Sequence, residues 1–273
     1  MALRFWKMNG AGNAFAIFDA RQTAFKPSAT DIRKLASEMN ADQLIALEPA
    51  ERGDVFMRIW NGDGGEVSAC GNVSRCVGHI LLQETDGPSV IIETRADRLM
   101  AKAVAGHPDL ISVDMGRPRF GWRDIPLSED MDVRGVDIKI GPMDKPYLAR
   151  PAVVSMGNPH AVFFVEDVSA YDIPAIGPLI EGHPIFPEGV NVGFAQIIDR
   201  TSIRLRVWER GAGLTLACGT GACAALVCAA RAKKTDRKAR LILDGGELEI
   251  DWSEHTDRVL MTGPVELEYT GEI

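Results

Sequence analysis

Two cysteines of this chain are each followed by glycine, and each stands at the start of a predicted helix. Cys70 lies in the segment ACGN and Cys218 in the segment ACGTGACAA. The free N–H groups and the positive dipole at a helix N-terminus favour a thiolate and a bound carboxylate. Each half of the chain therefore offers one thiol that can act as acid or base, beside half of an anion site.

The spacing of apolar residues predicts the elements that hold these thiols. After each cysteine, apolar residues recur three and four positions apart, as on the buried face of a helix. These residues are Val73, Cys76, Val77, Ile80 and Leu81 in the first helix and Ala222, Ala225, Leu226 and Ala229 in the second. Alternating apolar residues predict strands over 55–59 and 203–207, which lead into the glycine-rich turns NGDGG and ERGAG.

Two further elements are predicted away from the cysteines. A helix is expected over Thr30–Asn40, with Thr30 as its N-cap and an apolar face of Ile32, Leu35, Ala36 and Met39. The segment ARLILDGGELEIDW predicts a hairpin about Gly245-Gly246. Most of the remaining chain is predicted to be strand, interrupted by glycine and proline.

The surroundings of the two cysteines recur in the same order along the chain. Three pairs of residues correspond: Cys70 and Cys218, Gln43 and Asn191, and Asn13 and Asn158. The members of the first two pairs are 148 positions apart, and those of the third are 145 apart and each precede a short apolar strand. We therefore expect a duplicated chain whose halves are related by a pseudo-twofold axis, with a small-molecule site in the cleft between the domains.

Composition narrows the class of protein. A chain of 273 residues with 46% hydrophobic residues suits two domains, each with its own core. The net charge of −8 argues against general nucleic-acid binding, which needs clustered cations. No apolar run is long enough to cross a membrane and no charged-then-apolar leader is present, so we expect a cytoplasmic protein with no membrane partner.

The cysteine pattern predicts free thiols and no metal site. Five cysteines without a secretion signal do not form a typical disulfide framework. Cys218, Cys223 and Cys228 are spaced so that their sulfur atoms would be scattered around a helix axis, and Cys70 and Cys76 lack CxxC spacing. We interpret Cys76, Cys223 and Cys228 as small, buried apolar side chains.

Five motifs together resemble the diaminopimelate epimerase family. They are KMNGAGN (Lys7–Asn13), NGDGGEVSACGN (Asn61–Asn72), MGNPH (Met156–His160), EGVNVGF (Glu188–Phe194) and WERGAGLTLACGTGACAA (Trp208–Ala225). The resemblance covers essentially the whole chain in the family's order, and the last motif is highly specific. It implies cofactor-independent epimerisation of LL-2,6-diaminopimelate to the meso form, an isomerase step in lysine and peptidoglycan precursor biosynthesis.

The resemblance also implies a fold and an assembly. The expected fold is α+β, with two pseudo-symmetric domains that each form a barrel-like antiparallel or mixed sheet around a central helix. We expect an N-terminal half over 1–116 that carries Cys70, with a returning strand at 263–273, and a C-terminal half over 117–262 that carries Cys218. A homodimer is expected.

The same resemblance assigns roles to individual residues. Cys70 and Cys218 would be the base and the acid, and the backbone of Gly71-Asn72 and of Gly219-Thr220 would bind the reacting carboxylate. The other substrate-binding residues implied are Asn13, Gln43, Asn61, Asn158, Asn191, Glu209 and Arg210. The family commonly has histidine in place of Asn9 and an acidic residue in place of Ala14, and neither difference touches these positions.

The chemistry of the residues agrees with these roles. Inverting an α-carbon requires a base on one face and an acid on the other, which one thiolate and one thiol supply. With no carbonyl cofactor evident, backbone N–H groups at both helix starts must stabilise the charge that grows on the carboxylate. Arg210 and Glu209 suit the carboxylate and ammonium at the far end of the substrate.

Two alternatives remain open. A proline racemase or hydroxyproline epimerase shares the two-cysteine plan, but its substrate has a single carboxylate and gives the Glu209-Arg210 pair no obvious use. A redox-responsive dithiol protein would need Cys70 and Cys218 close enough for a disulfide, with Cα atoms about 4.4–6.8 Å apart. Individual asparagines also have a simpler interpretation, because Asn beside glycine often only accommodates a turn.

Overall fold

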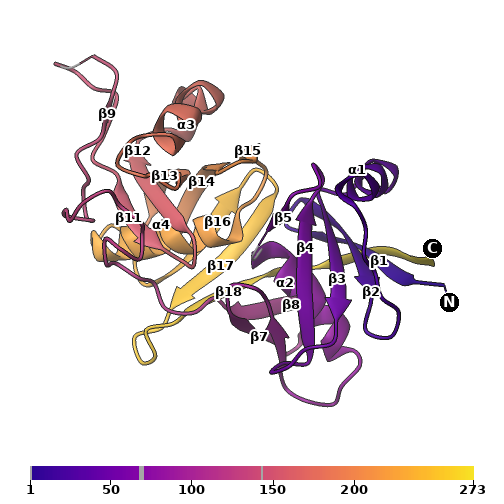
Figure 1. Cartoon of the computed structure of the whole chain (residues 1–273). Helices are drawn as coiled ribbons and strands as arrows, with labels where there is room; N and C mark the ends of the chain where they lie inside the picture. The colour runs from indigo at the N-terminus through magenta and orange to yellow at the C-terminus, as the bar shows by residue number, and fades with distance from the viewer. Residues whose placement is uncertain (1, 68–70, 143) are drawn as a thin grey trace. The chain divides into compact units, whose positions relative to one another are not determined.

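The computed structural model of the chain describes residues 2–67, 71–142 and 144–273. The chain divides into two units. In Figure 1 the colour runs with residue number, so unit 1 contains the indigo and purple elements together with the yellow C-terminal end of the chain. Unit 1 comprises Met1–Asp114 and Thr262–Ile273, and unit 2 comprises Met115–Met261. The chain passes from unit 2 back to unit 1 within strand β18 (Val259–Pro264).

Unit 1 consists of a mixed sheet and two helices. Its strands are β1 (Arg4–Gly10), β2 (Asn13–Asp19), β3 (Gln43–Glu48), β4 (Val55–Asn61), β5 (Glu66–Val67), β6 (Val90–Glu93), β7 (Arg98–Val104), β8 (His107–Asp114) and β19 (Glu266–Glu272). The pairs β2–β3 and β4–β6 are parallel, whereas β1–β2, β3–β4, β4–β5, β6–β7, β7–β8 and β1–β19 are antiparallel. The helices are α1 (Ala29–Glu38) and α2 (Gly71–Leu82).

Unit 2 has the same kind of architecture. Its strands are β9 (Lys139–Ile140), β10 (Leu148–Ala149), β11 (Ala152–Ser155), β12 (Pro159–Val165), β13 (Asn191–Asp199), β14 (Ser202–Glu209), β15 (Gly213–Thr215), β16 (Lys238–Leu243) and β17 (Gly246–Trp252). The helices are η1 (Val168–Ala170), α3 (Ile173–Glu181) and α4 (Gly219–Arg231). Strands β9 and β10 form a separate two-stranded sheet.

The order of strand pairing is the same in the two units. In each, an antiparallel pair, β1–β2 or β11–β12, is followed by a parallel pair, β2–β3 or β12–β13, and then by an antiparallel partner, β4 or β14. A short antiparallel strand follows, then the helix after the cysteine, then a strand parallel to β4 or β14. This shared order confirms the prediction of an α+β chain made of two pseudo-symmetric halves.

Helices α2 and α4 are buried on nearly all sides. Helix α2 contacts β1, β2, β6, β7 and β8, and α4 contacts β11 to β14, β16 and β17. The predicted apolar faces are buried, and the exposed fractions of Cys76, Cys223 and Cys228 are 0%, 0% and 2%. Burying each Val, Leu or Ile side chain contributes about 1.5–3 kcal/mol. The hydrophobic effect therefore holds the first turn of each helix in a fixed position within its unit.

The N-cap of α1 lies two residues before its predicted position. Ser28, not Thr30, is the N-cap: Ser28 Oγ accepts a hydrogen bond from Asp31 N at 3.2 Å, and Asp31 Oδ2 accepts one from Ser28 N at 2.9 Å. The predicted cap at Thr30 was wrong because this reciprocal pair satisfies two N–H groups at once. Ile32 and Ala36 are buried as expected.

Helix α3 was not predicted from the sequence. Two prolines and one glycine in IPAIGPLIE obscure its period, although proline is tolerated in the first turn. Asp172 caps the helix, accepting a hydrogen bond from Ala175 N at 3.2 Å. Ile173 and Ile180 are buried and fix one face of α3 against unit 2.

The predicted hairpin is present as β16 and β17. Leu243 pairs with Gly246, so the two-residue loop is Asp244-Gly245, one position before the expected centre. The positive φ at this hairpin belongs to Gly246, at 148°, the residue that follows the loop.

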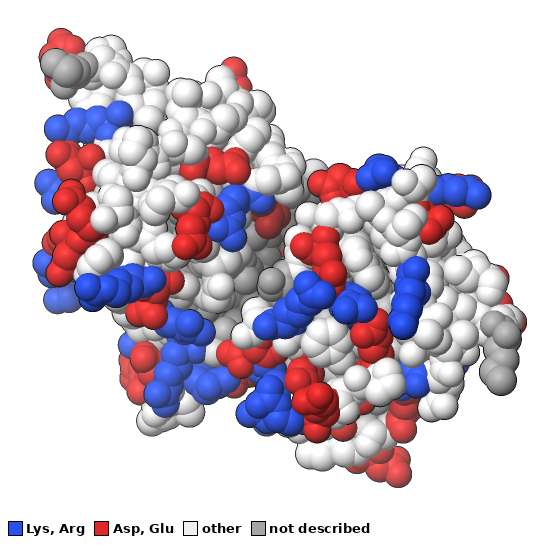
Figure 2. All heavy atoms as spheres, in the orientation of Figure 1, with Lys and Arg blue, Asp and Glu red and all other residues white. Residues whose placement is uncertain are grey.

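Charged groups of both signs are interspersed on the face that Figure 2 shows. None of the helices in the described ranges reaches the length and hydropathy that a membrane span requires.

Candidate active site

Equivalent glycine turns place an asparagine at the start of a strand in each unit. Gly12 and Gly157 have φ angles of 87° and 94°, in the left-handed region that glycine adopts without strain. Asn13 then opens β2, and Asn158 directly precedes β12. In the first turn Asn9 Oδ1 accepts a hydrogen bond from Gly12 N at 2.9 Å, so the residue that departs from the family pattern still stabilises the loop.

In unit 1 the predicted binding residues form two hydrogen-bonded pairs. Asn72, in the first turn of α2, donates from Nδ2 to Asn13 Oδ1 at 2.6 Å. Gln43 and Asn61 are cross-strand partners on β3 and β4, and Gln43 Nε2 donates to Asn61 Oδ1 at 2.8 Å. Gln43 Oε1 is buried, and no described residue donates a hydrogen bond to it. An unpartnered buried acceptor is costly, so it is suited to receive an N–H from a bound molecule.

Cys70 lies outside the described residues. Helix α2 begins at the next residue, Gly71, and both Gly71 and Asn72 are buried. The role of Cys70 therefore remains a prediction from the sequence.

In unit 2 Cys218 is the N-cap of α4. Its exposed fraction is 3%, and its Sγ accepts a hydrogen bond from Gly221 N at 3.4 Å. Thr220 Oγ1 lies 3.6 Å from the same sulfur atom. The predicted position of this thiol at a helix start is confirmed.

Asn158 and Thr220 are hydrogen-bonded through their side chains in unit 2, as Asn13 and Asn72 are in unit 1. Asn158 Nδ2 donates to Thr220 Oγ1 at 3.3 Å, and Asn158 Oδ1 lies 2.9 Å from His160 Nε2. His160 has an exposed fraction of 1% and is thus a buried support for Asn158. Gly219, the first residue of α4, is also buried.

Asn191 fixes the turn that carries Glu209 and Arg210. Its Nδ2 donates to Pro159 O at 2.9 Å, and its Oδ1 accepts from Arg210 N at 3.0 Å. Arg210 has an exposed side chain whose Nη1 donates to Glu188 O at 2.7 Å. The shift of 148 that relates Gln43 to Asn191 also relates Asn61 to Glu209, so the two halves use equivalent strand positions with different charges.

The surroundings of Cys218 keep its proton in place. Burial is the main cause that raises the pKa of the Cys218 thiol well above its ordinary value, and the negative charge of Glu209 adds to it. Hydrogen bonds from Thr220 and Gly221 act in the opposite direction. The helix N-terminus alone predicts a lowered pKa; in the ligand-free chain desolvation outweighs it. Burial also raises the pKa of Glu209.

Comparison with known sequences places the chain in a family. The sequence model of diaminopimelate epimerase matches residues 5–121 and 152–268. A diaminopimelate epimerase of Afipia carboxidovorans is 51% identical over 98% of this chain and 93% of that protein. One of Caulobacter sp. (strain K31) is 48% identical over 100% of this chain and 98% of that protein. The chain belongs to the diaminopimelate epimerase family.

Solved structures with low sequence identity to this chain share its fold. A predicted epimerase from Pseudomonas aeruginosa has a TM-score of 0.71 at 17% identity and covers 99% of each chain. A hydroxyproline epimerase from Agrobacterium vitis has a TM-score of 0.66 at 16% identity, covering 100% of this chain and 92% of that one. At these identities the likeness concerns the two-repeat fold alone.

Two residues that were not predicted from the sequence hold the Glu209-Arg210 pair in place. Thr215, on β15, donates from Oγ1 to Glu209 Oε1 at 2.6 Å. Glu181, the last residue of α3, accepts hydrogen bonds on both sides of the Glu209-Arg210 pair. Thr215 lies inside the quoted motif WERGAGLTLACGTGACAA and was overlooked there. Glu181 gave no signal because α3 itself was not predicted.

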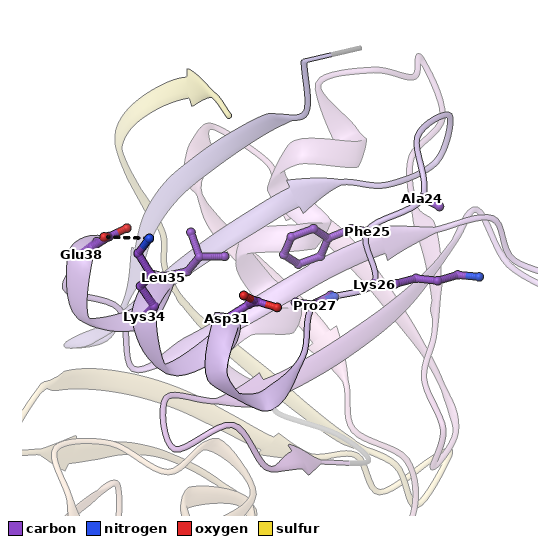
Figure 3. A pocket seen from close by; sticks show the side chains of 8 residues that line it. All are labelled: Ala24, Phe25, Lys26, Pro27, Asp31, Lys34, Leu35 and Glu38. Carbon is purple, nitrogen blue, oxygen red and sulfur yellow. Dashed lines mark ion pairs between the residues drawn. The ribbon is translucent and has the colours of Figure 1, made fainter.

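A hollow beside α1 is separate from these residues. It has a volume of about 360 Å³ and is lined by Ala24, Phe25, Lys26, Pro27, Asp31, Lys34, Leu35 and Glu38, as Figure 3 shows. Lys34 and Glu38 form an exposed ion pair at its edge. None of the predicted site residues of the epimerase family lines it. Within the described ranges, no group of three or more His, Cys, Asp or Glu side chains is arranged to hold a metal ion.

The buried side chain of His160 is expected to lower the free energy of unfolding of this protein in mild acid. Burial, and then the charge of Arg210, lowers the pKa of His160 from 6.5 to about 3. Between these values the unfolded chain binds a proton that the folded chain does not, so the free energy of unfolding falls as the pH falls. From pH 7.5 to 5.5 this histidine should account for a loss of about 1.3 kcal/mol.

Urea unfolding of the original protein and of His160→Gln at both pH values measures this contribution. The variant should show the smaller loss between the two pH values, while His107→Gln, at an exposed histidine, should behave as the original protein does. An equal pH dependence in the original protein and His160→Gln would contradict the assignment.

Proposed function

We propose that this chain converts LL-2,6-diaminopimelate to meso-diaminopimelate without a cofactor, as an isomerase of lysine and peptidoglycan precursor biosynthesis. Membership of the family supports this proposal. The observation that carries it is the position of Cys218, a buried thiol at the N-cap of α4 beside Glu209. Such a thiol retains its proton in the ligand-free protein and is suited to deliver that proton to a carbanion.

Two thiols would divide the proton transfer. In one direction the thiolate of Cys70 takes the α-proton and the Cys218 thiol returns a proton to the other face, and in the reverse direction the roles exchange. A pair of separate groups is needed because the proton leaves one face of the carbon and arrives at the opposite one. The halves over 1–116 with 263–273 and over 117–262 would each supply one of these cysteines.

Backbone N–H groups would stabilise the intermediate. Removing the α-proton places negative charge on the reacting carboxylate, which the N–H groups of Gly71-Asn72 and of Gly219-Thr220 are proposed to bind. Amides at a helix start are aligned before the reaction and carry the positive end of the helix dipole. In support, Asn13 and Asn158 hold the side chains of Asn72 and Thr220, which fixes both helix starts.

The remaining binding residues suit a substrate with a second amino-acid head group. Arg210 would bind the far carboxylate as a planar fork, and Glu209 would accept from the far ammonium group. Gln43 and Asn61 in unit 1, with Asn191 in unit 2, would complete the set. The buried, unpartnered Gln43 Oε1 supports a role in accepting a substrate N–H.

The proposed reaction is tested by incubating the reduced protein with LL-diaminopimelate and separating the stereoisomers by chromatography. Accumulation of the meso isomer to an equilibrium mixture is expected. Parallel reactions with L-proline and trans-4-hydroxy-L-proline should show no inversion. Inversion of either of these, without conversion of diaminopimelate, would replace the substrate while keeping the two-thiol chemistry.

We further propose that the protein acts in the cytoplasm as a homodimer. Strand β19 supports the dimer, because all but one of its residues are exposed and two of them, Leu267 and Tyr269, are large and apolar. Sedimentation velocity should give a mass near twice 29.7 kDa. The double variant Leu267→Lys, Tyr269→Lys should sediment as a monomer, and an unchanged dimer would show that β19 is not the interface.

A further inference from the structure

The last residue of α3 is hydrogen-bonded to β14 and to the turn that follows this strand. Glu181 Oε2 accepts a hydrogen bond from Trp208 Nε1 at 2.6 Å, and Glu181 Oε1 accepts one from Gly211 N at 2.9 Å. The two residues between these donors are Glu209 and Arg210. One carboxylate therefore spans the segment that carries both charged groups proposed to bind the far end of the substrate.

The position of Glu181 is not explained by the stability of its own helix. A carboxylate in the last turn of a helix lies at the negative end of the dipole and is disfavoured there. Its two hydrogen bonds are instead made to groups outside the helix, and both are charge-assisted. The stabilisation that Glu181 provides is thus directed at the turn.

The packing around Trp208 makes this connection rigid. A Cβ atom at Gly177, in the middle of α3, would lie 2.4 Å from the ring of Trp208, so only glycine lets the helix approach the indole this closely. Trp208 also pairs with Val192 on β13 and with Leu214 on β15. Movement of the end of α3 would therefore move the turn.

The residues after α3 hold Arg210 from another direction. Glu188 O accepts from Arg210 Nη1, and a Cβ atom at Gly189 would lie 2.9 Å from Arg210 Cδ. With Asn191 Oδ1 bonded to Arg210 N, the stretch 181–191 positions the arginine backbone, its stem and its guanidinium. Helix α3 and the loop after it act together as a support for this one side chain.

In unit 1 the equivalent connection is made by a basic side chain that donates a hydrogen bond, whereas Glu181 is acidic and accepts. Arg33 on α1 donates from Nη1 to Asp63 O at 3.1 Å, and a shift of 148 positions relates Asp63 to Gly211. The same shift relates Trp60 to Trp208. Both halves thus connect a helix to the turn after the fourth strand of the repeat, but only unit 2 places an acidic and a basic residue in the connected segment.

From these contacts we infer that Glu181 is a positioning residue for substrate specificity, which holds Glu209 and Arg210 in place to bind the second amino-acid head group. The inference rests on the proposed function. It concerns binding of the far end of the substrate, and Glu181 takes no part in proton transfer.

Glu181→Gln is the variant that tests this role, because it keeps the size of the side chain and removes its charge and one acceptor. The KM for LL-diaminopimelate should rise roughly tenfold, with kcat changed by less than about twofold, because a charged hydrogen bond that positions the binding groups is lost. For a 2-amino acid of the same length that ends in a methyl group, the rate of α-hydrogen exchange with solvent should be unchanged. Trp208→Phe removes the indole donor and should raise the KM in the same way.

A matched control weakens α3 at its other end. Asp172→Ala removes the N-cap of α3 and should lower the midpoint of urea unfolding without raising the KM. An unchanged KM in folded Glu181→Gln and Trp208→Phe, or an equal rise in Asp172→Ala, would overturn the inference. No turnover of diaminopimelate by the original protein would overturn the proposed function and this inference with it, whereas normal turnover with an unchanged KM in the variants would overturn the inference alone.

Discussion

Cys218→Ala is expected to lower the rate of diaminopimelate epimerisation by about 10²–10⁴-fold, because this is what a positioned acid or base contributes and no other described thiol lies at the start of α4. The fold should be retained, since Cys218 is an N-cap whose Sγ makes only long hydrogen bonds, to Gly221 N at 3.4 Å and with Thr220 Oγ1 at 3.6 Å. Steady-state kinetics with LL-diaminopimelate, together with circular dichroism, measure both effects. Cys70→Ala should lose activity to the same extent.

The same helix provides matched controls for this experiment. Cys223 and Cys228 are buried thiols of α4 that lie away from its N-terminus, and burial raises the pKa of Cys228 to about 12. Cys223→Ala and Cys228→Ala should each leave kcat within about twofold while removing a small apolar contact, at a stability cost of about 1 kcal/mol. If these variants were as inactive as Cys218→Ala, the loss would be due to packing and not to acid–base chemistry.

Arg210→Met is expected to reduce kcat/KM for diaminopimelate roughly 150-fold, mainly through a higher KM. The substitution keeps a similar apolar stem and removes the guanidinium that would bind the far carboxylate, and loss of such a charge pair costs about 3 kcal/mol. Arg210→Lys should recover only part of the affinity, because an ammonium group cannot make the planar, two-point contact. Initial rates over a range of substrate concentrations separate the effect on KM from the effect on kcat.

Arg206 offers a control on the strand that precedes Arg210. Arg206 lies on β14, and its Nε donates to Asp244 Oδ2 at 3.0 Å in an ion pair at the surface. Arg206→Met should leave both kinetic constants unchanged, because a partly exposed pair of this kind contributes about 0–1 kcal/mol to stability. Equal kinetic losses in Arg206→Met and Arg210→Met would point to a general charge effect and contradict specific recognition.

The sequence predicted the parts of the fold whose apolar period is uninterrupted. Helices α2 and α4 were identifiable because their buried residues recur at helical spacing and each follows a glycine-rich turn. The hairpin of β16 and β17 was identifiable from its alternation and its glycines. The repeat became evident only because Cys70 and Cys218 have matching neighbours, whereas the structure shows it in the order of strand pairing.

Packing determines what the sequence did not predict. Helix α3 has two prolines and a buried glycine, and it is a helix because its apolar face is covered and Asp172 caps it. The raised pKa of Cys218 arises from burial and from Glu209, nine positions earlier, whereas the position of the thiol at a helix start alone predicts a lowered value. Glu181 contacts a turn that lies 27 to 30 positions further along the chain, a relationship with no signature in a single sequence.

The most direct test of the two-thiol account is the isotopic content of substrate and product after brief reaction in deuterated water. Because one group takes the α-proton and a different group, exchanged with solvent, returns one, the meso product should carry deuterium at the inverted carbon. The unreacted LL-diaminopimelate should still carry hydrogen at that stage. Meso product that retains the original hydrogen would show that a single group both removes and returns the proton, and would contradict the account.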